Sequence, residues 1–241
     1  SLEAAVLKLL GSPGEEFQSV ESVLESVDRA VSLLQKRGVV PNRLGVDGLP
    51  GSGKSTFARA IADRLGFKWK CLDFENMTDP QDFTPERMVY EHHRLFRTQD
   101  VDAFDVIIYV NESVEMSKTR VFQRARKEGR TSLFVDLLDY DKLEKIGKLA
   151  FHLCEGEPIS VPGSSLLMKI RPQGGFRAIE NIVGRLRAAG HDAEGMGKEE
   201  MLFLLAFGKP RSGTMAYFLP GAYKEEVVRG LMAGLRRYMV E

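Results

Sequence analysis

The chain has 241 residues, of which 43% are hydrophobic and 28% are charged, and these values are typical of a globular protein with a substantial core. Its 34 basic and 34 acidic residues cancel, so the overall positive field of a nucleic-acid-binding protein is absent and nucleic acid is an unlikely partner. Two cysteines, Cys71 and Cys154, are too few for a disulfide framework and favour a cytoplasmic protein. No apolar run is long enough to cross a bilayer, so no membrane partner is expected.

Apolar residues recur at helical spacing over residues 15–37, which predicts an amphipathic N-terminal helix. Beyond it, strand-like and helix-like segments alternate, which is typical of an α/β protein with a mainly parallel sheet. The predicted strands are 43–47, 67–73, 105–110, 165–170 and 215–219, and the predicted helices are 56–65, 85–97, 113–128, 141–153, 176–189, 201–207 and 223–239. We therefore expect one domain over 1–241, with residues 1–40 as a helical extension and 113–132 as a lid.

Residues 48–55 read G-L-P-G-S-G-K-S, which matches the phosphate-loop pattern G-x-x-x-x-G-K-[ST]. The motif follows a predicted strand and opens a predicted helix, as a phosphate loop does. Glycines allow successive backbone N–H groups to converge on one anion, and the helix N-terminus adds its positive dipole end. The sequence therefore predicts a three-layer P-loop NTPase fold that binds ATP and Mg²⁺. The predicted nucleotide-binding residues are Gly48, Leu49, Pro50, Gly51, Ser52, Gly53, Lys54, Ser55 and Thr56.

Chemical roles follow from residue type and position. Lys54 is expected to reach the β- and γ-phosphates, and the Ser55 hydroxyl is expected to be a ligand of Mg²⁺. Asp73 ends a predicted strand, where a carboxylate can act as a catalytic base or hold the metal; the alternative is a helix or turn cap. Glu75 is a second, weaker candidate.

Arginines cluster in the predicted helix 113–128 and just beyond it. Arg120 and Arg124 are four residues apart and share a helix face, and Arg126 and Arg130 repeat the spacing. Arginines on a lid can neutralise charge on a transferring phosphoryl group, although a solvated charged face explains the same pattern.

The run Glu91-His92-His93-Arg94 could face a substrate, but a solvated helix face is favoured for its histidines. Adjacent histidines point in different directions on a helix, so a shared metal site is not expected.

Residues 44–130 resemble the uridine kinase and phosphoribulokinase group of P-loop kinases, to which bacterial pantothenate kinase is similar. The resemblance rests on the first strand with its loop, on Asp73-Phe74, on the segment T-D-P-Q-D-F at 78–83, and on the Arg-rich helix after the strand at 105–110. It implies phosphorylation of a small-molecule hydroxyl by ATP, with Asp73 as base and Arg120 and Arg124 as lid residues.

The chain departs from that group at two places. It has Glu75 where those kinases usually carry an aromatic residue. Their further strand ending in Glu-Gly is expected to be absent or displaced, because residue 97 is followed almost directly by the strand at 105–110. Asp136, in a Walker-B-like run, is an alternative source of the metal-side carboxylate.

The sequence therefore predicts a small-molecule kinase with Lys54, Asp73, Arg120 and Arg124 as catalytic residues and Ser55 and Asp73 at the metal. Two alternatives stay open: an ATPase that acts as a regulatory switch, and a kinase of nucleotides or nucleic-acid ends. The latter could use a basic patch formed by Lys209, Arg211, Arg229, Arg236 and Arg237, although helix-surface solvation explains these charges as well. The acceptor is not readable from the sequence, and a homodimer is compatible with it.

Overall fold

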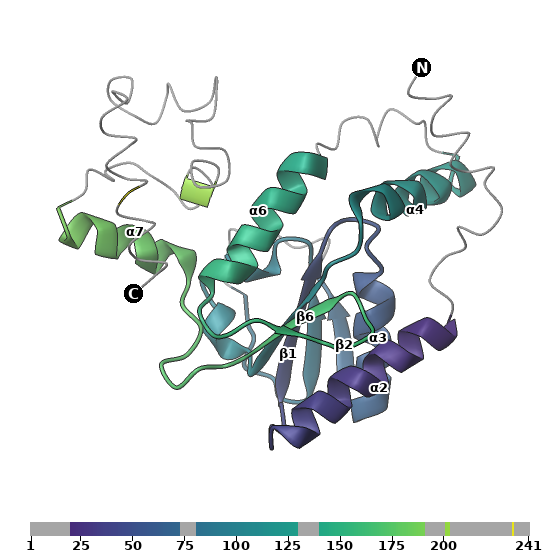
Figure 1. Ribbon diagram of the computed structural model, residues 1–241, viewed down its shortest axis with the longest axis horizontal. Helices are drawn as coiled ribbons and strands as arrows, with labels where there is room; N and C mark the ends of the chain where they lie inside the picture. Colours follow the sequence, from purple (N-terminus) through teal and green to yellow (C-terminus); the bar gives the residue numbers. More distant parts are fainter. Residues whose placement is uncertain (1–19, 73–80, 130–139, 191–200, 203–232, 234–241) are drawn as a thin grey trace.

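The computed structural model describes residues 20–72, 81–129, 140–190, 201–202 and 233 (Figure 1). Its centre is a six-stranded mixed sheet with the order β2-β3-β1-β4-β6-β5. The strands are β1 (Arg43–Gly48), β2 (Lys68–Cys71), β3 (Met88–Glu91), β4 (Val106–Val110), β5 (Ile159–Ser160) and β6 (Leu166–Ile170). Strands β1 to β4 are parallel, whereas β6 runs antiparallel to β4 and β5 antiparallel to β6. The mainly parallel α/β architecture expected from the sequence is thus confirmed.

Helices lie on both faces of this sheet. The helices are α2 (Val20–Lys36), α3 (Lys54–Leu65), α4 (Val114–Lys127), α6 (Tyr140–Leu153) and α7 (Ile179–Ala188), with short 3₁₀ turns η1 (Leu95–Arg97) and η2 (Val101–Ala103). Helices α2 and α3 pack side by side on one face. The opposite face is covered by η1, η2 and part of α6.

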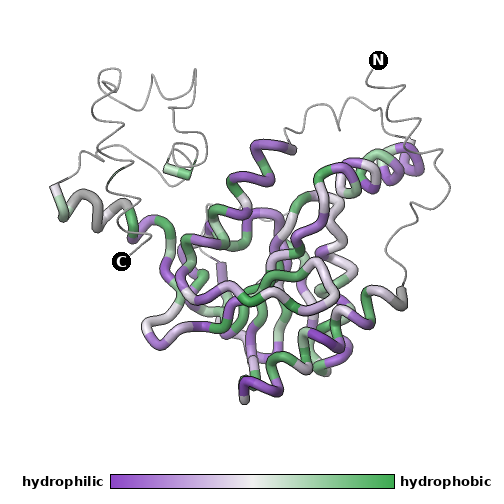
Figure 2. The backbone as a smooth tube through the Cα atoms, in the orientation of Figure 1, coloured by the Kyte–Doolittle hydropathy of each residue, from purple (hydrophilic) through white to green (hydrophobic). Residues whose placement is uncertain are grey.

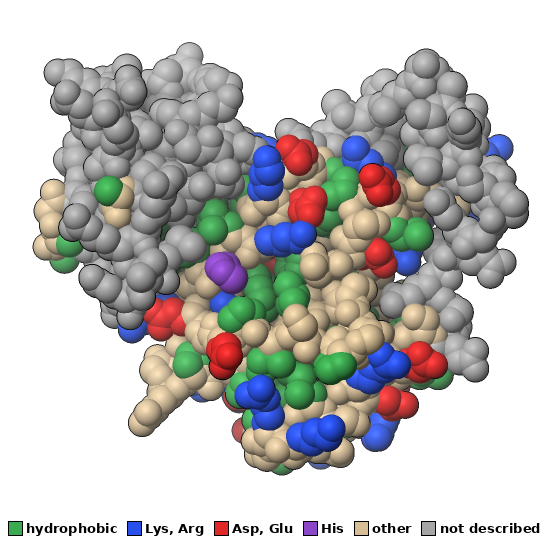
Figure 3. All heavy atoms as spheres, viewed as in Figure 1, with side chains coloured by type: hydrophobic (Ala, Val, Ile, Leu, Met, Phe, Trp, Pro, Cys, Tyr) green, Lys and Arg blue, Asp and Glu red, His purple; other side chains and the backbone are tan. Residues whose placement is uncertain are grey.

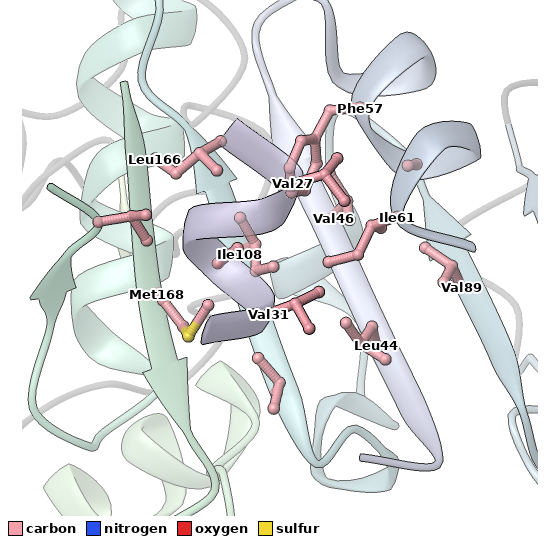
Figure 4. Close-up of a cluster of buried hydrophobic side chains, with 14 of the residues drawn as sticks. Val27, Val31, Leu44, Val46, Phe57, Ile61, Val89, Ile108, Leu166 and Met168 are labelled. Carbon is pink, nitrogen blue, oxygen red and sulfur yellow. The ribbon is translucent and has the colours of Figure 1, made fainter. Parts of the chain in front are cut away.

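The core on the α2–α3 face joins residues that are far apart in the sequence (Figure 4). Val27 and Val31 of α2 meet side chains of α3 and of four strands, and each buried aliphatic side chain of this kind stabilises the fold by about 1.5–3 kcal/mol. The strand and α3 residues labelled there are Leu44, Val46, Phe57, Ile61, Val89, Ile108, Leu166 and Met168. Helix α2 is therefore a part of the core, and the predicted N-terminal extension contributes at least residues 20–36 to it.

Hydropathy explains why the sheet is central. All five residues of β4 are buried, and the tube in Figure 2 shows hydrophilic and hydrophobic residues alternating along α4. The second core cluster is aromatic, with Phe83 packed edge-on against Tyr90 at 4.8 Å between ring centroids and against Phe104 at 4.9 Å. A strand buried on both faces suits a mainly parallel sheet between two layers.

The prediction of a helix over residues 85–97 was wrong. Arg87 adopts a left-handed conformation with φ of 56°, which breaks a helix, and residues 88–91 form β3 instead. Strand β3 pairs with both β1 and β2, so it occupies the position beside the phosphate-loop strand. The short η1 turn follows at residues 95–97.

The other predicted elements that fall on described residues are present, with boundaries shifted by a few residues. The sequence did not predict β5 or the antiparallel direction of β6. Of the predicted helix 201–207 only residues 201–202 are described, and they are helical, while the segments 215–219 and most of 223–239 lie outside the described residues. Within the described part of the chain, no helix combines the length and apolar character needed to span a bilayer.

Candidate functional site

The predicted phosphate loop connects the carboxyl end of β1 to the first turn of α3. Strand β1 ends at Gly48, and α3 begins at Lys54. Gly51 and Gly53 have φ angles of 81° and 89°, a region that side chains disfavour, so the loop needs glycine at both positions. Ligands of open parallel sheets bind at the carboxyl ends of the strands, which is where this loop lies.

The loop is packed tightly against its neighbours. A Cβ atom on Gly48 would lie 2.6 Å from Ser52 Oγ and 3.1 Å from the Val110 carbonyl oxygen. A Cβ atom on Gly51 would overlap the Ser117 carbonyl oxygen of α4. The first glycine therefore lets the loop fold over its own strand, and the second lets α4 approach its outer side.

Two polar side chains of the loop, those of Lys54 and Ser52, are buried. Lys54 is 7% exposed, and none of the described carboxylates lies within salt-bridge distance of it. Ser52 is fully buried, and its Oγ makes no hydrogen bond within the described part of the chain. Buried polar groups are normally paired, so these groups mark a place where a polar ligand is expected to complete the structure.

Ser55 donates a hydrogen bond from its Oγ to Glu91 Oε1 at 2.8 Å. Glu91 is the last residue of β3, directly beside β1, and it is fully buried. Its second oxygen, Oε2, has no hydrogen-bond partner among the described residues. The sequence placed no strand between the segment 78–83 and the predicted lid and expected a strand ending in Glu-Gly to be absent or displaced. The structure corrects the first point, since β3 lies there and ends in Glu91, followed by His92.

The sequence named Glu91 only as part of a polar run that could face a substrate, and its position at the end of a strand was missed because residues 85–97 were interpreted as a helix. A usable signal existed. Met88-Val89-Tyr90 is a short run of β-prone residues that ends in a single carboxylate, as expected of a strand end at the ligand edge.

Asp47 lies beneath the loop as the penultimate residue of β1 and is 2% exposed. Its carboxylate accepts hydrogen bonds from the Gly48 N–H at 2.6 Å and from the Phe96 N–H at 3.2 Å. Burial raises the pKa of Asp47 to about 6, although these hydrogen bonds and the positive charges of Arg97 and Lys54 act in the opposite direction. The phosphate loop is thereby fastened to η1.

His92 and His93 lie on a turn after β3, and the solvated helix face favoured for them does not exist. Their rings stack with centroids 4.2 Å apart. His92 is buried, and its Nδ1 accepts a hydrogen bond from the Arg94 backbone N–H at 2.9 Å. This bond requires an unprotonated Nδ1, so the neutral His92 ring carries its proton on Nε2.

The predicted lid arginines lie in different environments. Arg120 is buried, and its guanidinium donates to the Gly51 carbonyl oxygen at 3.3 Å and to Glu112 Oε2 at 3.4 Å. Arg124 is exposed. Helix α6 adds a third contact, because the Tyr140 hydroxyl donates to the Pro50 carbonyl oxygen at 2.9 Å. The structure therefore brings Arg120 to the loop, together with a tyrosine that the sequence did not suggest.

Several predicted residues lie outside the described part of the chain. These are Asp73, Glu75, Arg130, Asp136 and all five members of the suggested C-terminal basic patch. Thr56 is exposed on the first turn of α3. Across the described residues, no group of three or more His, Cys, Asp and Glu side chains has the arrangement of a metal site, so Ser55 and Glu91 are the oxygen donors brought together here.

A cavity of about 640 Å³ lies elsewhere, between α6 and the β5–β6 hairpin, and no phosphate-loop residue lines it. Two of its lining lysines, Lys145 and Lys148, are paired with acidic residues one helical turn earlier. On the face drawn in Figure 3, the described basic and acidic side chains are interspersed. The features that converge at the phosphate loop therefore define the candidate site.

Comparison of the chain with protein-family models, with curated proteins and with solved structures gives no match, so no family is assigned to it.

Proposed function

We propose that this chain is an ATP-dependent kinase that transfers the γ-phosphoryl group of Mg·ATP to a hydroxyl group of a small molecule. The observation that carries the proposal is the hydrogen bond between Ser55 Oγ and Glu91 Oε1. It joins the hydroxyl of a phosphate-loop motif to a buried carboxylate on the neighbouring parallel strand. A polyphosphate and a divalent cation bind side by side at such an arrangement.

The triphosphate is suited to the charge and donors of the loop. Lys54 supplies a buried ammonium group, and the N-terminus of the 12-residue helix α3 supplies backbone N–H groups and the positive end of its dipole. A buried cation without a carboxylate in contact is costly, so an anionic ligand at this point stabilises the folded loop.

Mg²⁺ is suited to the oxygen donors. Glu91 Oε2 is buried and has no hydrogen-bond partner in the part of the chain that the structure describes, and Ser55 Oγ is only 2.8 Å from the other oxygen of the same carboxylate. Mg²⁺ prefers oxygen ligands and retains several waters, so one hydroxyl, one nearby carboxylate and the phosphates of the nucleotide are sufficient. When bound, the ion neutralises charge on the β- and γ-phosphates.

The residues of the chain then have separable tasks in the transfer. The acceptor hydroxyl oxygen forms a bond to the γ-phosphorus while the bond to the β–γ bridging oxygen breaks, and the hydroxyl proton passes to a base. Lys54 neutralises charge on the phosphates, and Glu91 orients Ser55 through its carboxylate. Asp73 remains the base that we propose from the sequence, since it follows β2 beside β3 in the strand order.

The proposal is tested by incubating the purified chain with Mg·ATP and a panel of alcohols that includes nucleosides, sugars, sugar phosphates and hydroxy acids. We expect slow release of phosphate without an acceptor and formation of ADP at least tenfold faster with one acceptor class. Asp73→Asn is expected to abolish transfer and to leave ATP affinity within about twofold, because a base contributes roughly 10²–10⁴-fold to the chemical step and little to binding.

Three outcomes would contradict the proposal at different levels. Absence of ATP binding would refute nucleotide binding altogether. Rapid hydrolysis that no acceptor accelerates would favour the ATPase switch. Unchanged transfer in Asp73→Asn would retain the kinase but remove Asp73 from its mechanism.

A further inference from the structure

The outer side of the phosphate loop is held by two helices that contribute nothing to the loop motif. Pro50 and Gly51 each present a carbonyl oxygen to this side, and each oxygen accepts one side-chain hydrogen bond, from Tyr140 of α6 and Arg120 of α4 respectively. We propose that Tyr140 is a positioning residue for nucleotide binding, which orients the Pro50–Gly51 peptide so that the Gly51 N–H is directed at the phosphates. This inference rests on the proposed function and deepens it.

The Pro50–Gly51 peptide bond links the Tyr140 contact to the direction of the Gly51 N–H. All described peptide bonds are trans, so the carbonyl oxygen of Pro50 and the N–H of Gly51 point in opposite directions. The Tyr140 hydroxyl fixes the oxygen toward α6 at 2.9 Å. The Gly51 N–H is therefore turned away from α6, toward the inner side of the loop. Residues 49–52 form a turn that is closed by a hydrogen bond from the Ser52 N–H to the Leu49 carbonyl oxygen at 3.0 Å, and the Tyr140 contact adds a second restraint on the central Pro50–Gly51 peptide of this turn.

The position of Tyr140 is itself well determined. Its side chain is 1% exposed and packs in a small apolar cluster with Leu49 of the loop and Val121 of α4. The Lys118 ammonium lies 5.6 Å from the centre of its ring. Burial raises the pKa of the Tyr140 phenol, so its hydroxyl keeps its proton and remains a donor over the whole range in which kinases are assayed.

Arg120 holds the loop at a second point, the neighbouring carbonyl oxygen of Gly51. The guanidinium is held by Glu112 on its other side, so it cannot rotate away without breaking an ion pair at 3.4 Å. Gly51 is pressed against α4, where a Cβ atom would overlap the Ser117 carbonyl oxygen. The loop is therefore clamped between α4 and α6, and Tyr140 is the member of this clamp that can be altered by removing a single oxygen atom.

The test compares Tyr140→Phe with a control, Tyr90→Phe. The control also removes a phenol hydroxyl, but from the aromatic cluster on the face of the sheet that α2 and α3 do not cover. The measured quantities are the dissociation constants of Mg·ATP and Mg·ADP, the melting temperature, and the ¹⁵N–¹H chemical shifts of Gly51 with and without Mg·ADP. We expect Tyr140→Phe to weaken both nucleotides by about three- to tenfold, as for the loss of one hydrogen bond, and to raise KM for ATP more than it lowers kcat. Tyr90→Phe is expected to leave both dissociation constants unchanged.

The Gly51 amide separates a positioning role from a merely structural one. In the wild-type chain its proton resonance is expected to move strongly on addition of Mg·ADP, and this shift is expected to be at least halved in Tyr140→Phe. Wild-type affinity and an unchanged Gly51 shift in Tyr140→Phe would overturn the inference and leave the proposed function intact. If the wild-type chain itself binds neither nucleotide, the proposed function fails first. If both variants lose affinity together with several degrees of melting temperature, the effect belongs to general stability, and the inference is overturned as well.

Discussion

The two sides of the phosphate loop differ in their chemistry. The side that faces β3 is polar and incomplete: it holds a buried ammonium on Lys54 and a carboxylate oxygen on Glu91 that none of the described residues satisfies. The side that faces α4 and α6 is complete, since the Pro50 and Gly51 carbonyls both have donors and Leu49 packs in an apolar cluster. We therefore propose that the β3 side receives a ligand (the ligand side) and that the α4–α6 side keeps the loop in shape (the shape-keeping side).

The largest expected effect tests the ligand side. Lys54→Met is expected to lower kcat/KM for ATP by about 10²–10³-fold, because it removes the buried charge that we propose stabilises the transferring phosphoryl group. The matched control is Lys68→Met, at an exposed position on β2, which is expected to be neutral. Similar rates for the two variants in a coupled ADP assay would contradict a role for Lys54 on the ligand side of the loop.

A second prediction concerns the buried charge beneath the loop. The pKa of Asp47 is about 6 in the folded chain and 3.8 in the unfolded chain, so the folded state binds more protons between these pH values. The resulting stabilisation is present below about pH 4 and is lost as the pH rises through 6, a change of about 3 kcal/mol.

Asp47→Asn removes this dependence. Relative to the wild-type chain, its free energy of unfolding is expected to improve between pH 4 and pH 7, as measured by urea denaturation at a series of pH values. A difference between the two proteins that stays constant over this range would show that Asp47 does not titrate as a buried acid.

The third prediction addresses the metal. Glu91→Gln preserves the shape of the side chain and removes its charge, so the Mg²⁺ concentration for half-maximal activity is expected to rise by about 10–100-fold. Glu86→Gln, at an exposed position just before β3, provides the control and is expected to leave Mg²⁺ dependence unaltered. An unchanged Mg²⁺ requirement in Glu91→Gln would show that the metal does not bind next to β3.

The smallest expected effect tests the shape-keeping side. Gly51→Ala and Gly38→Ala both place a side chain at positive φ, 81° and 66°, which costs about 1–2 kcal/mol in each case. Only at Gly51 does the new Cβ atom meet another element, so this variant is expected to lose at least about 1 kcal/mol more in thermal or urea unfolding. Equal destabilisation of the two variants would mean that α4 does not press on the loop.

The sequence motif indicated which residues form the loop but not which helices hold its outer side, for a physical reason. The phosphate loop is a local structure: its glycines, Lys54 and Ser55 all lie within residues 48–55, and a strand and a helix flank them as the pattern requires. Tyr140 is separated from Pro50 by 90 positions, and only tertiary packing brings the two together. A helical pattern shows which residues share a face but not which backbone oxygen that face meets.

Glu91 lies between these extremes. It is encoded in a strand of only four residues, and Pro85 ahead of it suggested the start of a helix. The left-handed conformation of Arg87 prevents a helix here, and arginine is not a residue type from which that conformation is predicted. The direction of β6 was also not predicted. Strand β6 forms a hairpin with β5 and pairs antiparallel with β4, and β5 has only two residues, too few to give a sequence pattern.

The position of the divalent ion tests the central claim most directly. Mn²⁺ binds the same oxygen ligands as Mg²⁺, and its unpaired electrons broaden the NMR signals of nearby nuclei. With the ¹⁵N-labelled chain and ATP, substoichiometric Mn²⁺ is predicted to broaden the amides of Ser55 and Glu91 first, while those of β5 and α7 stay sharp. Broadening centred elsewhere, or equally strong without ATP and with Lys54→Met, would contradict a Mg·ATP site between the phosphate loop and β3.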